Sequence, residues 1–461
     1  MRLRLCAATL AGKVAARLAR LCGRRGSSLP GVVALRLYPG VLARLVSQVR
    51  TGVIIVTGTN GKTTTSNMIA RMLASAGFRV INNREGANLI TGVTAAFVRA
   101  ADLFGRIHCD YAVLEVDEAS FPRVAAQTNP RLVVVTNFFR DQLDRYGELD
   151  TTISFIRRTL AERPHISLVL NADDPLVAQL ARYVRNTKFY GLAPRSAGAP
   201  RGATSREARF CPFCGHSLEY TGYHYSQLGI YQCTGCGFAR PRPDVEAAAA
   251  AVAGQVMRSR VRWEEKVISV VLPTQGVYNL YNALAAFTTG MVLGIDPATA
   301  AASLGHYTPA TGRLEGFLYR GKPVYLNLVK NPAGFNESLN LLFAGRGTGD
   351  VFIAINDNDA DGHDISWLWD VDFEVLAGVK DKLSFVCSGK RGAEMAVRLK
   401  YAGVPPRKIT VVDNLRAAID CTLNGRGGAA YFLATYTALW PVEKLLRRRV
   451  TRTALENAAD V

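Results

Sequence analysis

The hydrophobic pattern predicts a strand, a tight turn and a helix near the start of the chain. Residues 53–56 form an apolar, β-branched run, and the glycine-rich segment 57–64 follows directly. Apolar side chains then recur at helical spacing from Met68 to Leu73. The hydrophobic period therefore changes from that of a buried strand to that of a helix across the glycines.

The last third of the chain predicts a second α/β unit. Short apolar runs alternate there with helical stretches, at residues 324–329, 351–355, 383–387, 409–412 and 430–434. Strands that alternate with helices are typical of a parallel sheet. We therefore expect a small Rossmann-like α/β domain at the C-terminal end.

The pattern also predicts a basic amphipathic helix before the first strand. An apolar stripe and a basic stripe run side by side at helical spacing, formed by Leu10, Val14, Leu18 and Leu21 and by Lys13, Arg17, Arg20 and Arg24. The first acidic residue of the chain is Glu85. Three interpretations stay open: a solvated helix packed on the body of the protein, a peripheral contact with an anionic membrane surface, or a cleaved signal peptide.

Composition narrows the class of protein. The chain has 461 residues, 49% of them hydrophobic and 20% charged, and a net charge of +19. This composition excludes whole-chain disorder, and the lack of an apolar run near 18 residues argues against a spanning helix. The nine cysteines include two CxxC pairs, which is metal-type, cytosolic usage. We expect a cytoplasmic protein, with contact at the inner face of the cell membrane as an open alternative.

The glycine-rich segment has the residues of a phosphate-binding loop, namely Gly58, Thr59, Asn60, Gly61, Lys62, Thr63 and Thr64. Glycines let consecutive backbone N–H groups converge on phosphate oxygens at the positive end of the next helix. Lys62 is then placed to reach the terminal phosphates of ATP, and the Thr63 hydroxyl to bind Mg²⁺. The strict Walker spacing is not met, but the strand, turn and helix context is the required one. The alternative is a chance glycine turn.

Further motifs, in the same order along the chain, resemble the Mur ligase family, whose ATP-dependent members join amino acids to peptidoglycan precursors. The matching pieces are a strand ending in Glu115, the segment 132–147 with Asn137, the NADDP turn at 171–175, a helix with Asn279 and Asn282, the GRxE sequence at 312–315 and Lys330-Asn331-Pro332. Gln142 and Lys330 stand where the family has histidines. The resemblance implies that Glu115 binds Mg²⁺ and that Asn137, Asn279, Asn282 and Arg313 contact ATP.

Each of these residues also has a plainer interpretation. Glu115 could be a surface acid on an edge strand, although a carboxylate beside a phosphate loop is where such enzymes keep a second metal contact. Asn137 could cap the next helix. Asp173 and Asp174 are interpreted as turn residues ahead of a proline rather than as catalysts.

Four cysteines predict a structural zinc site. Cys211 and Cys214 form one CxxCG turn, and Cys233 and Cys236 form the other. Four thiolate ligands leave no open coordination position, so the ion would stabilise a small module. Glycine-, proline- and arginine-rich stretches flank the module, which indicates an insertion at about 205–242. A nucleic-acid-binding ribbon is the alternative, with four tyrosines that could stack on bases: Tyr220, Tyr223, Tyr225 and Tyr231.

An acid-rich segment follows the second strand of the C-terminal domain, from Asn356 to Asp370. An EF-hand calcium loop does not fit, because its twelfth position is Leu368 rather than glutamate. A solvated loop stays open. Within the Mur ligase family, this segment and the four-cysteine insertion resemble the ligase-like subunits that amidate lipid II. That resemblance implies a GatD-like glutaminase subunit as heterodimer partner, lipid II as substrate at the membrane surface, and no nucleic acid. It also implies that Asp361 or Asp364 completes the partner's Cys-His pair.

The resemblance therefore predicts a Mur ligase-type P-loop domain at 51–311 with the zinc ribbon inserted, preceded by the basic segment 1–50 and followed by the α/β domain at 312–461. The implied reaction is ATP-dependent amidation of the α-carboxyl of D-glutamate in the lipid II stem peptide, with Lys62 and Glu115 catalytic in this chain. Ammonia must come from another polypeptide, since Cys387 lacks the setting of a glutaminase nucleophile. The alternatives are a folylpolyglutamate synthase-like or other amino-acid ligase, and a zinc-ribbon ATPase acting on nucleic acid.

Overall fold

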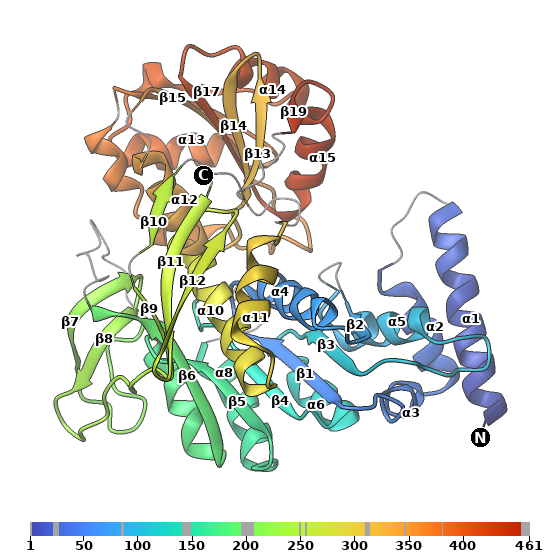
Figure 1. The fold of residues 1–461 in the computed structure, drawn as a ribbon. Helices are drawn as coiled ribbons and strands as arrows, with labels where there is room; N and C mark the ends of the chain where they lie inside the picture. The colour runs from blue at the N-terminus through green and yellow to red at the C-terminus, as the bar shows by residue number, and fades with distance from the viewer. Residues whose placement is uncertain are drawn as a thin grey trace.

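The computed structural model describes residues 2–21, 27–83, 87–140, 149–194, 207–248, 250–253, 256–308, 314–344, 347–379 and 381–452. These residues form two α/β units in succession along the chain, one around a ten-stranded sheet and one around a seven-stranded sheet (Figure 1). The mixed α/β fold class is thereby confirmed. The division at residues 50 and 311 stays a prediction.

The larger sheet has a parallel core in which β1 lies between β4 and β3. Its order is β10-β11-β9-β6-β5-β4-β1-β3-β2, with β12 paired to β11. Among the described strands of this sheet, every antiparallel pair includes β11, which pairs with β9, β10 and β12. The strands are β1 (Gly52–Thr57), β2 (Val80–Asn82), β3 (Tyr111–Glu115), β4 (Leu132–Val135), β5 (Ser167–Asn171), β6 (Asn186–Leu192), β9 (Val245–Ala247), β10 (Ala251–Ala253), β11 (Val256–Trp263) and β12 (Lys266–Leu272).

Helices cover both faces of this sheet. Successive side chains of a strand point to opposite faces, so Ile54 and Val56 of β1 join one hydrophobic cluster while Val53 and Ile55 join the other. Apolar runs without polar alternation are expected for parallel strands buried on both sides. The first cluster includes α4 (Lys62–Ser75), α10 (Val277–Val292) and α11 (Pro297–Gly305), and the second α5 (Ile90–Ala100), α6 (Phe121–Thr128), α8 (Leu149–Ala161), α9 (Pro175–Ala178) and η1 (Gln179–Tyr183).

Three helices precede β1 and pack against α5 and α6 at one end of the molecule (Figure 1). They are α1 (Arg2–Leu21), α2 (Leu29–Leu37) and α3 (Val41–Val46). The expected N-terminal helix is therefore present. Leu5 and Ala8 of α1 belong to the hydrophobic cluster that covers one face of the central sheet. No helix in the described part of the chain has the length and apolar character needed to cross a bilayer.

The second sheet contains all five strands expected from the apolar runs. Its order is β17-β16-β15-β18-β14-β13-β19, parallel from β17 to β14. Two antiparallel strands at the β14 edge were not expected from the pattern. The elements are β13 (Glu315–Tyr319), β14 (Lys322–Leu328), α12 (Pro332–Ala344), β15 (Gly349–Ala354), η3 (Ser366–Asp370), η4 (Phe373–Gly378), β16 (Leu383–Ser388), α13 (Gly392–Tyr401), η5 (Pro406–Lys408), β17 (Ile409–Val411), α14 (Leu415–Leu423), β18 (Ala429–Ala434), α15 (Tyr436–Leu446) and β19 (Thr451–Arg452).

A small hairpin lies between β6 and β9 in sequence and carries the four cysteines. It consists of β7 (Leu218–Tyr225) and β8 (Leu228–Cys233), which pair only with each other within the described structure. Since β6 and β9 are hydrogen-bonded neighbours, the hairpin is an insertion between adjacent strands of the main sheet. The expected insertion is confirmed.

Candidate functional site

The phosphate-loop segment forms a tight turn between the central strand and α4. Strand β1 ends at Thr57, and α4 begins at Lys62 with Gly61 as its N-terminal flanking residue at φ 86°. A Cβ atom at Gly61 would overlap the side-chain oxygen of Asn282. Glycine is therefore required here both by the left-handed backbone and by the close approach of α10. The backbone N–H groups at the start of α4 form a site suited to an anion.

Lys62 is buried behind this loop, with 7% of its surface exposed. Its Nζ donates to the carbonyl oxygen of Gly58 at 2.6 Å and forms an ion pair with Glu118 at 3.2 Å. Glu118 was not predicted from the sequence as a residue of the site. The signal was present, because Glu118 belongs to an acidic run that follows β3 directly.

Glu115 ends β3, which lies between β1 and β2. Its register partner is Val56, one residue before the end of β1, and it is 3% exposed. The backbone N of Glu115 donates to Asn83 Oδ1 at 2.9 Å, and Asn83 Nδ2 donates to the carbonyl oxygen of Glu115 at 2.8 Å. Asn88 Nδ2 donates to the carboxylate oxygen Oε1 of Glu115 at 3.5 Å. The interpretation as a surface acid on an edge strand is therefore wrong. Glu115 lies at the same edge of the sheet as Thr63, in the first turn of α4.

Asn137 follows β4 and holds the loop. Its Oδ1 accepts from the backbone N of Asn60 at 2.9 Å, and its Nδ2 donates to the carbonyl oxygen of Asn60 at 3.1 Å. Thr136 donates to the same carbonyl at 2.8 Å. Asn137 thus fixes the position of the phosphate-loop backbone. The other members of its motif, from Asp141 to Gly147, lie outside the described residues.

Asn279 and Asn282 lie on the first turns of α10, beside the loop. Asn282 Oδ1 accepts from the Thr65 hydroxyl at 3.3 Å, and Asn279 Nδ2 donates to the carbonyl oxygen of Gln275 at 2.7 Å. Arg313 lies outside the described residues. Its motif partner Glu315 is buried and forms an ion pair with Arg447 at 2.7 Å.

The C-terminal unit also reaches the phosphate loop. Lys330 Nζ donates to the carbonyl oxygen of Thr59 at 3.1 Å. Asn331 and Asn60 exchange two side-chain amide hydrogen bonds, at 3.1 and 3.3 Å. The Lys330-Asn331-Pro332 motif therefore lies against the loop from which it is separated by more than 260 residues in sequence.

A cavity lies beside the phosphate loop where the central unit, the C-terminal unit and the cysteine-bearing hairpin meet. Five of the residues selected from sequence for nucleotide binding line it: Asn60, Gly61, Thr64, Asn137 and Asn282. Further lining residues that sequence did not select for this cavity are Tyr225 and Leu228 of the hairpin, Tyr278 and Tyr281 of α10, Asn327, Leu328, Lys330, Gly334 and Glu337. Backbone amides, four asparagine side chains and aromatic rings in one cavity suit a nucleotide.

Glu337 places a titratable carboxyl in this cavity. It lies on α12 and is 8% exposed, and burial raises the pKa of Glu337 to about 7. Asn340 Nδ2 donates to its Oε1 at 2.9 Å. A carboxyl with a raised folded-state pKa binds its proton more tightly in the folded protein than in the unfolded chain, so its ionisation opposes folding.

Stability is therefore expected to depend on pH through Glu337. The free energy of unfolding should fall by up to about 3 kcal/mol as the pH rises from about 4.5 to about 7, and this contribution should be constant above that range. Glu337→Gln should remove it. Urea denaturation of both proteins across this range measures the difference. Identical pH profiles for the parent and the variant would contradict the assignment.

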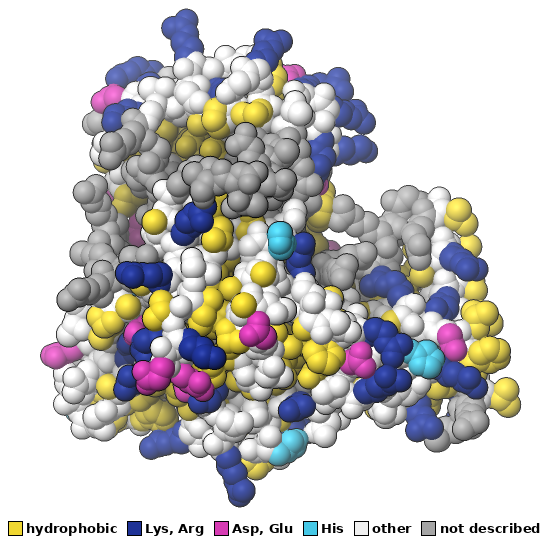
Figure 2. Space-filling view, in the orientation of Figure 1, with side chains coloured by type: hydrophobic (Ala, Val, Ile, Leu, Met, Phe, Trp, Pro, Cys, Tyr) yellow, Lys and Arg dark blue, Asp and Glu magenta, His cyan; other side chains and the backbone are white. Residues whose placement is uncertain are grey.

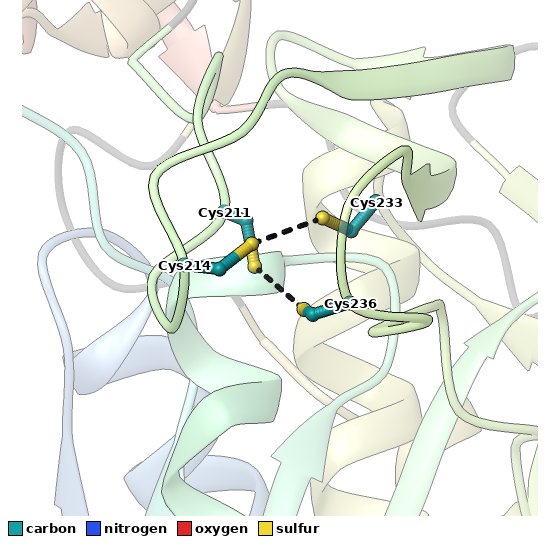
Figure 3. A group of neighbouring side chains, drawn as sticks. All are labelled: Cys211, Cys214, Cys233 and Cys236. Atoms are coloured by element: carbon teal, nitrogen blue, oxygen red, sulfur yellow. Dashed lines mark hydrogen bonds between the residues drawn. The ribbon is translucent and has the colours of Figure 1, made fainter.

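The four cysteines meet at the base of the hairpin (Figure 3). Their four sulfur atoms lie within 4.8 Å of one another, with Sγ separations of 3.5 Å between Cys211 and Cys236 and 3.4 Å between Cys214 and Cys233. Tetrahedral Zn²⁺ with Zn–S bonds of about 2.3 Å holds sulfurs about 3.8 Å apart. The donor set and its spacing therefore fit zinc.

The aromatic residues of the ribbon pack on one another and on the main sheet. Tyr231 is 2% exposed and donates to the carbonyl oxygen of Ala172 at 3.1 Å. Tyr225 is 5% exposed and contacts Phe139, while Tyr220 and Tyr223 stack at 4.6 Å. Tyr231 and the partly buried Tyr220 belong to the small core of the ribbon, and Tyr225 belongs to the core of the central unit. These three rings are therefore not exposed for stacking on the bases of a nucleic acid.

The two candidate aspartates of the acid-rich segment differ in burial and in their hydrogen-bond partners. Asp361 is 4% exposed and accepts from the backbone N of Thr437 at 2.7 Å and from the Thr437 hydroxyl. Asp364 is exposed and accepts from the backbone N and the hydroxyl of Ser366 at 2.8 and 2.9 Å. Asp361 therefore holds the segment onto α15, whereas Asp364 lies at the surface.

Asp173 and Asp174 have structural contacts. Asp173 is fully buried, pairs with Arg240 at 2.6 Å and accepts from the Tyr281 hydroxyl at 2.7 Å. Asp174 caps α9, and burial raises the pKa of Asp174 to about 7. Cys387 is also fully buried, which raises the pKa of its thiol to about 12. The interpretation of Cys387 as a buried small residue is confirmed.

Two family models match the chain. The Mur ligase middle domain matches residues 56–208, and the MurT ligase C-terminal model matches residues 328–439. Among characterised relatives, the lipid II isoglutaminyl synthase (glutamine-hydrolyzing) subunit MurT of Staphylococcus aureus (strain N315) is 37% identical over 95% of this chain and 96% of its own. The subunit of the same name from Streptococcus pneumoniae (strain ATCC BAA-255 / R6) is 34% identical over 92% and 93%.

Solved structures show the same fold. A pseudomurein peptide ligase type C from Methanothermus fervidus has a TM-score of 0.66 at 24% identity, covering 88% of this chain and 80% of its own. The MurF ligase from Thermotoga maritima in complex with ADP has a TM-score of 0.63 at 14% identity, covering 92% and 85%. The Mur ligase-type architecture expected from the motifs is confirmed.

Proposed function

Since this chain belongs to the family of MurT subunits of lipid II isoglutaminyl synthase, we propose that it is the ligase subunit of an enzyme that amidates lipid II. The reaction is the ATP-dependent conversion of the α-carboxyl of D-glutamate in the stem peptide to an amide, which gives D-isoglutamine. Ammonia comes from a GatD-like glutaminase subunit. The enzyme works at the cytoplasmic face of the cell membrane, where its substrate is anchored.

The observation that carries this proposal is the cavity at the phosphate loop, which both α/β units complete. Lys62 comes from the central unit, and Lys330 approaches the same loop from the C-terminal unit. Two cations within reach of one phosphate loop suit the transfer of a phosphoryl group, because charge builds up on its oxygens. Contacts from a second unit suit an enzyme that brings an acceptor to ATP.

A free carboxylate does not react with ammonia at neutral pH, because it is an anion with a poor leaving group. Phosphorylation of the carboxylate by the γ-phosphate of ATP releases ADP and gives an acyl phosphate. Ammonia then attacks the acyl carbon and phosphate leaves. Lys62 and the loop amides hold the phosphates, while Asn137 keeps the loop in place.

The metal ions have separate places in this scheme. The Thr63 hydroxyl and the Glu115 carboxylate would hold Mg²⁺, which would supply positive charge to neutralise phosphate oxygens. Zn²⁺ would be held by the four thiolates of the ribbon. With four protein ligands it has a structural role only.

Asp364 is the better candidate for contact with the glutaminase. An aspartate that completes a partner's Cys-His pair has to lie at the surface, where Asp364 lies. Asp361 is occupied by Thr437 and Asn358 within this chain. We therefore assign the partner contact to Asp364 and a local structural role to Asp361.

Asp364→Asn is expected to uncouple amidation by the ligase subunit from glutamine hydrolysis by the glutaminase subunit. Glutamine-dependent amidation should fall by about 100-fold or more, because the partner's histidine loses the group that orients it. Amidation from ammonium salts should be unchanged. The matched control is Asp359→Asn, which alters another exposed carboxylate of the same segment and should leave both rates intact. Equal loss of both rates in the Asp364→Asn protein would contradict the assignment.

The proposed function is tested with the purified chain, ATP, Mg²⁺ and lipid II. Mass spectrometry of the product should show replacement of one hydroxyl by an amino group when the glutaminase and glutamine are added. Ammonium salts should substitute for both. Absence of the mass change in either arm, with nucleotide binding intact, would show that the acceptor is different.

Family membership sets aside the alternatives from sequence. An amino-acid ligase of the folylpolyglutamate synthase type would not need the acid-rich segment, which here packs on the second sheet with Asp364 outward. The ribbon does not favour a nucleic-acid-dependent ATPase, because Tyr225 and Tyr231 are buried and Tyr220 and Tyr223 stack on each other.

A further inference from the structure

Helix α1 packs on the protein through a face made mainly of small residues. Ala8, Gly12, Ala16 and Ala19 are buried on this side, together with Leu5. A Cβ at Gly12 would lie 2.8 Å from Val98 Cγ1 and 2.9 Å from the carbonyl oxygen of Pro30, so α1 approaches α2 and α5 closely. Close packing of small residues thus fixes the side of α1 that faces the body, and Leu5 is the one leucine among the residues named on it.

Those large apolar residues form a stripe on the opposite side. Their exposed fractions are 86% for Leu3, 50% for Leu10, 45% for Val14, 57% for Leu18 and 83% for Leu21. Spacings of seven, four, four and three residues keep them on one helical face. The stripe runs for about 27 Å at 1.5 Å per residue. This outcome differs from the simple expectation that the apolar side of an amphipathic helix packs on the body.

A loop extends the apolar surface at the beginning of the helix. Leu103 and Phe104 are 62% and 68% exposed. Cys6 of α1 donates to the carbonyl oxygen of Phe104 at 3.3 Å, which places this loop beside the first turns of α1. We call Leu3, Leu10, Val14, Leu18, Leu21, Leu103 and Phe104 the α1 surface.

Basic residues border the α1 surface. Arg4 and Arg17 are exposed on the two sides of the stripe, and Arg106 lies 5.8 Å from the centre of the Phe104 ring. The chain has no acidic residue before Glu85. Figure 2 shows hydrophobic and basic side chains adjoining along the outer edge of the molecule, where Figure 1 places α1.

We propose that the α1 surface binds an anionic lipid bilayer, with the helix lying in the plane of the interface. Apolar side chains would enter the boundary between headgroups and acyl chains, and the flanking arginines would contact lipid phosphates. Charge complementarity favours a membrane over a protein partner, because exposed arginines border the apolar stripe of α1, a helix without an acidic residue. Asp102, the acid beside Leu103, is held in its own loop by hydrogen bonds from the backbone N of Phe104 and of Arg106. The purpose of this contact rests on the proposed function, in which the acceptor carries a lipid.

Vesicle co-sedimentation of the full chain tests this proposal. Vesicles of phosphatidylglycerol and phosphatidylcholine should bind the protein, and vesicles of phosphatidylcholine alone should bind it weakly. Val14→Thr combined with Leu18→Gln should lower the partition coefficient by at least about tenfold. Arg4→Gln combined with Arg17→Gln should lower it by a similar factor, on the anionic vesicles only.

The matched control is Val267→Thr combined with Leu318→Gln, which changes the same residue types at exposed positions on β12 and β13. This control should bind vesicles like the parent. Equal loss in the control and the α1 variant, or no binding to anionic vesicles at low salt, would overturn the proposal. So would loss of glutaminase binding by the α1 variant with unchanged vesicle binding, because the surface would then serve a protein.

A second measurement separates this proposal from the proposed function. The α1 variant should amidate lipid II in detergent at the parental rate and lipid II in anionic vesicles more slowly. Failure of amidation in every protein, with vesicle binding intact, would contradict the proposed function alone. Equal rates in vesicles for parent and variant would contradict the membrane role of α1 alone.

Discussion

Lys62→Ala is expected to lower ATP-dependent amidation by at least about a thousandfold, because it removes the buried cation of the phosphate loop. Lys62 is the only lysine on the loop or in the first turn of α4. Its ammonium already lies against the loop backbone, 2.6 Å from the carbonyl oxygen of Gly58. Product formation with ammonium salts measures the loss directly, without the glutaminase.

The ion pair with Glu118 complicates this substitution. Both side chains are largely buried, and removing one member of a buried pair leaves an uncompensated charge that costs about 3 kcal/mol. Lys62→Ala combined with Glu118→Gln removes both charges and separates instability from lost catalysis. The doubly substituted protein should fold and still fail to make product. Lys188→Ala is the control, because Lys188 pairs with Asp244 on the surface of β6. Parental turnover by the folded double variant would refute the role of Lys62.

Loss of zinc is expected to weaken nucleotide binding, although the ion would not touch the nucleotide. The four cysteines close the base of the β7–β8 hairpin, and the opposite end of the same hairpin contributes Tyr225 and Leu228 to the cavity. A structural zinc site supplies much of the folding free energy of such a small module. Cys233→Ser should therefore disorder this wall of the cavity and lower ATP affinity by at least about tenfold.

Metal analysis and calorimetry test this coupling in the full chain. The parent should contain one zinc per chain, and Cys233→Ser should contain less and bind ATP more weakly. Cys421→Ser is the matched control, since Cys421 is an exposed cysteine of α14 away from the cluster. Normal ATP affinity in a zinc-free Cys233→Ser protein would show that the hairpin keeps its shape without the ion.

Much of the site is readable from sequence because its chemistry lies on contiguous residues. The loop from Gly58 to Thr64 carries its own strand, turn and helix, and each CxxCG pair sets the spacing of two thiols. The five apolar runs of the C-terminal unit are strands for the same reason, since a fully buried strand needs only its own side chains to be apolar. The two antiparallel strands β13 and β19 were missed because β13 alternates buried and partly exposed residues and β19 has only two residues.

Contacts between segments that are distant along the chain could not be predicted from the sequence. Lys330 meets Thr59, and Tyr225 meets the nucleotide cavity, through the way in which two sheets and a hairpin pack. Glu118 was passed over because three carboxylates lie within four residues at the end of β3, and only side-chain direction shows which of them meets Lys62. Asp361 and Asp364 are equivalent in sequence and differ only in burial.

The sequence by itself determined the family, the phosphate loop, the thiol cluster and the α/β order of this protein, because each depends on residue type and local spacing. The tertiary structure alone decided which charges pair, which aspartate is exposed and which face of α1 is covered. The periodicity of α1 predicts an apolar stripe but cannot say where it points. Small residues on the other face allow a closer approach to α2 and α5, and shape complementarity there leaves Leu3, Leu10, Leu18 and Leu21 outside.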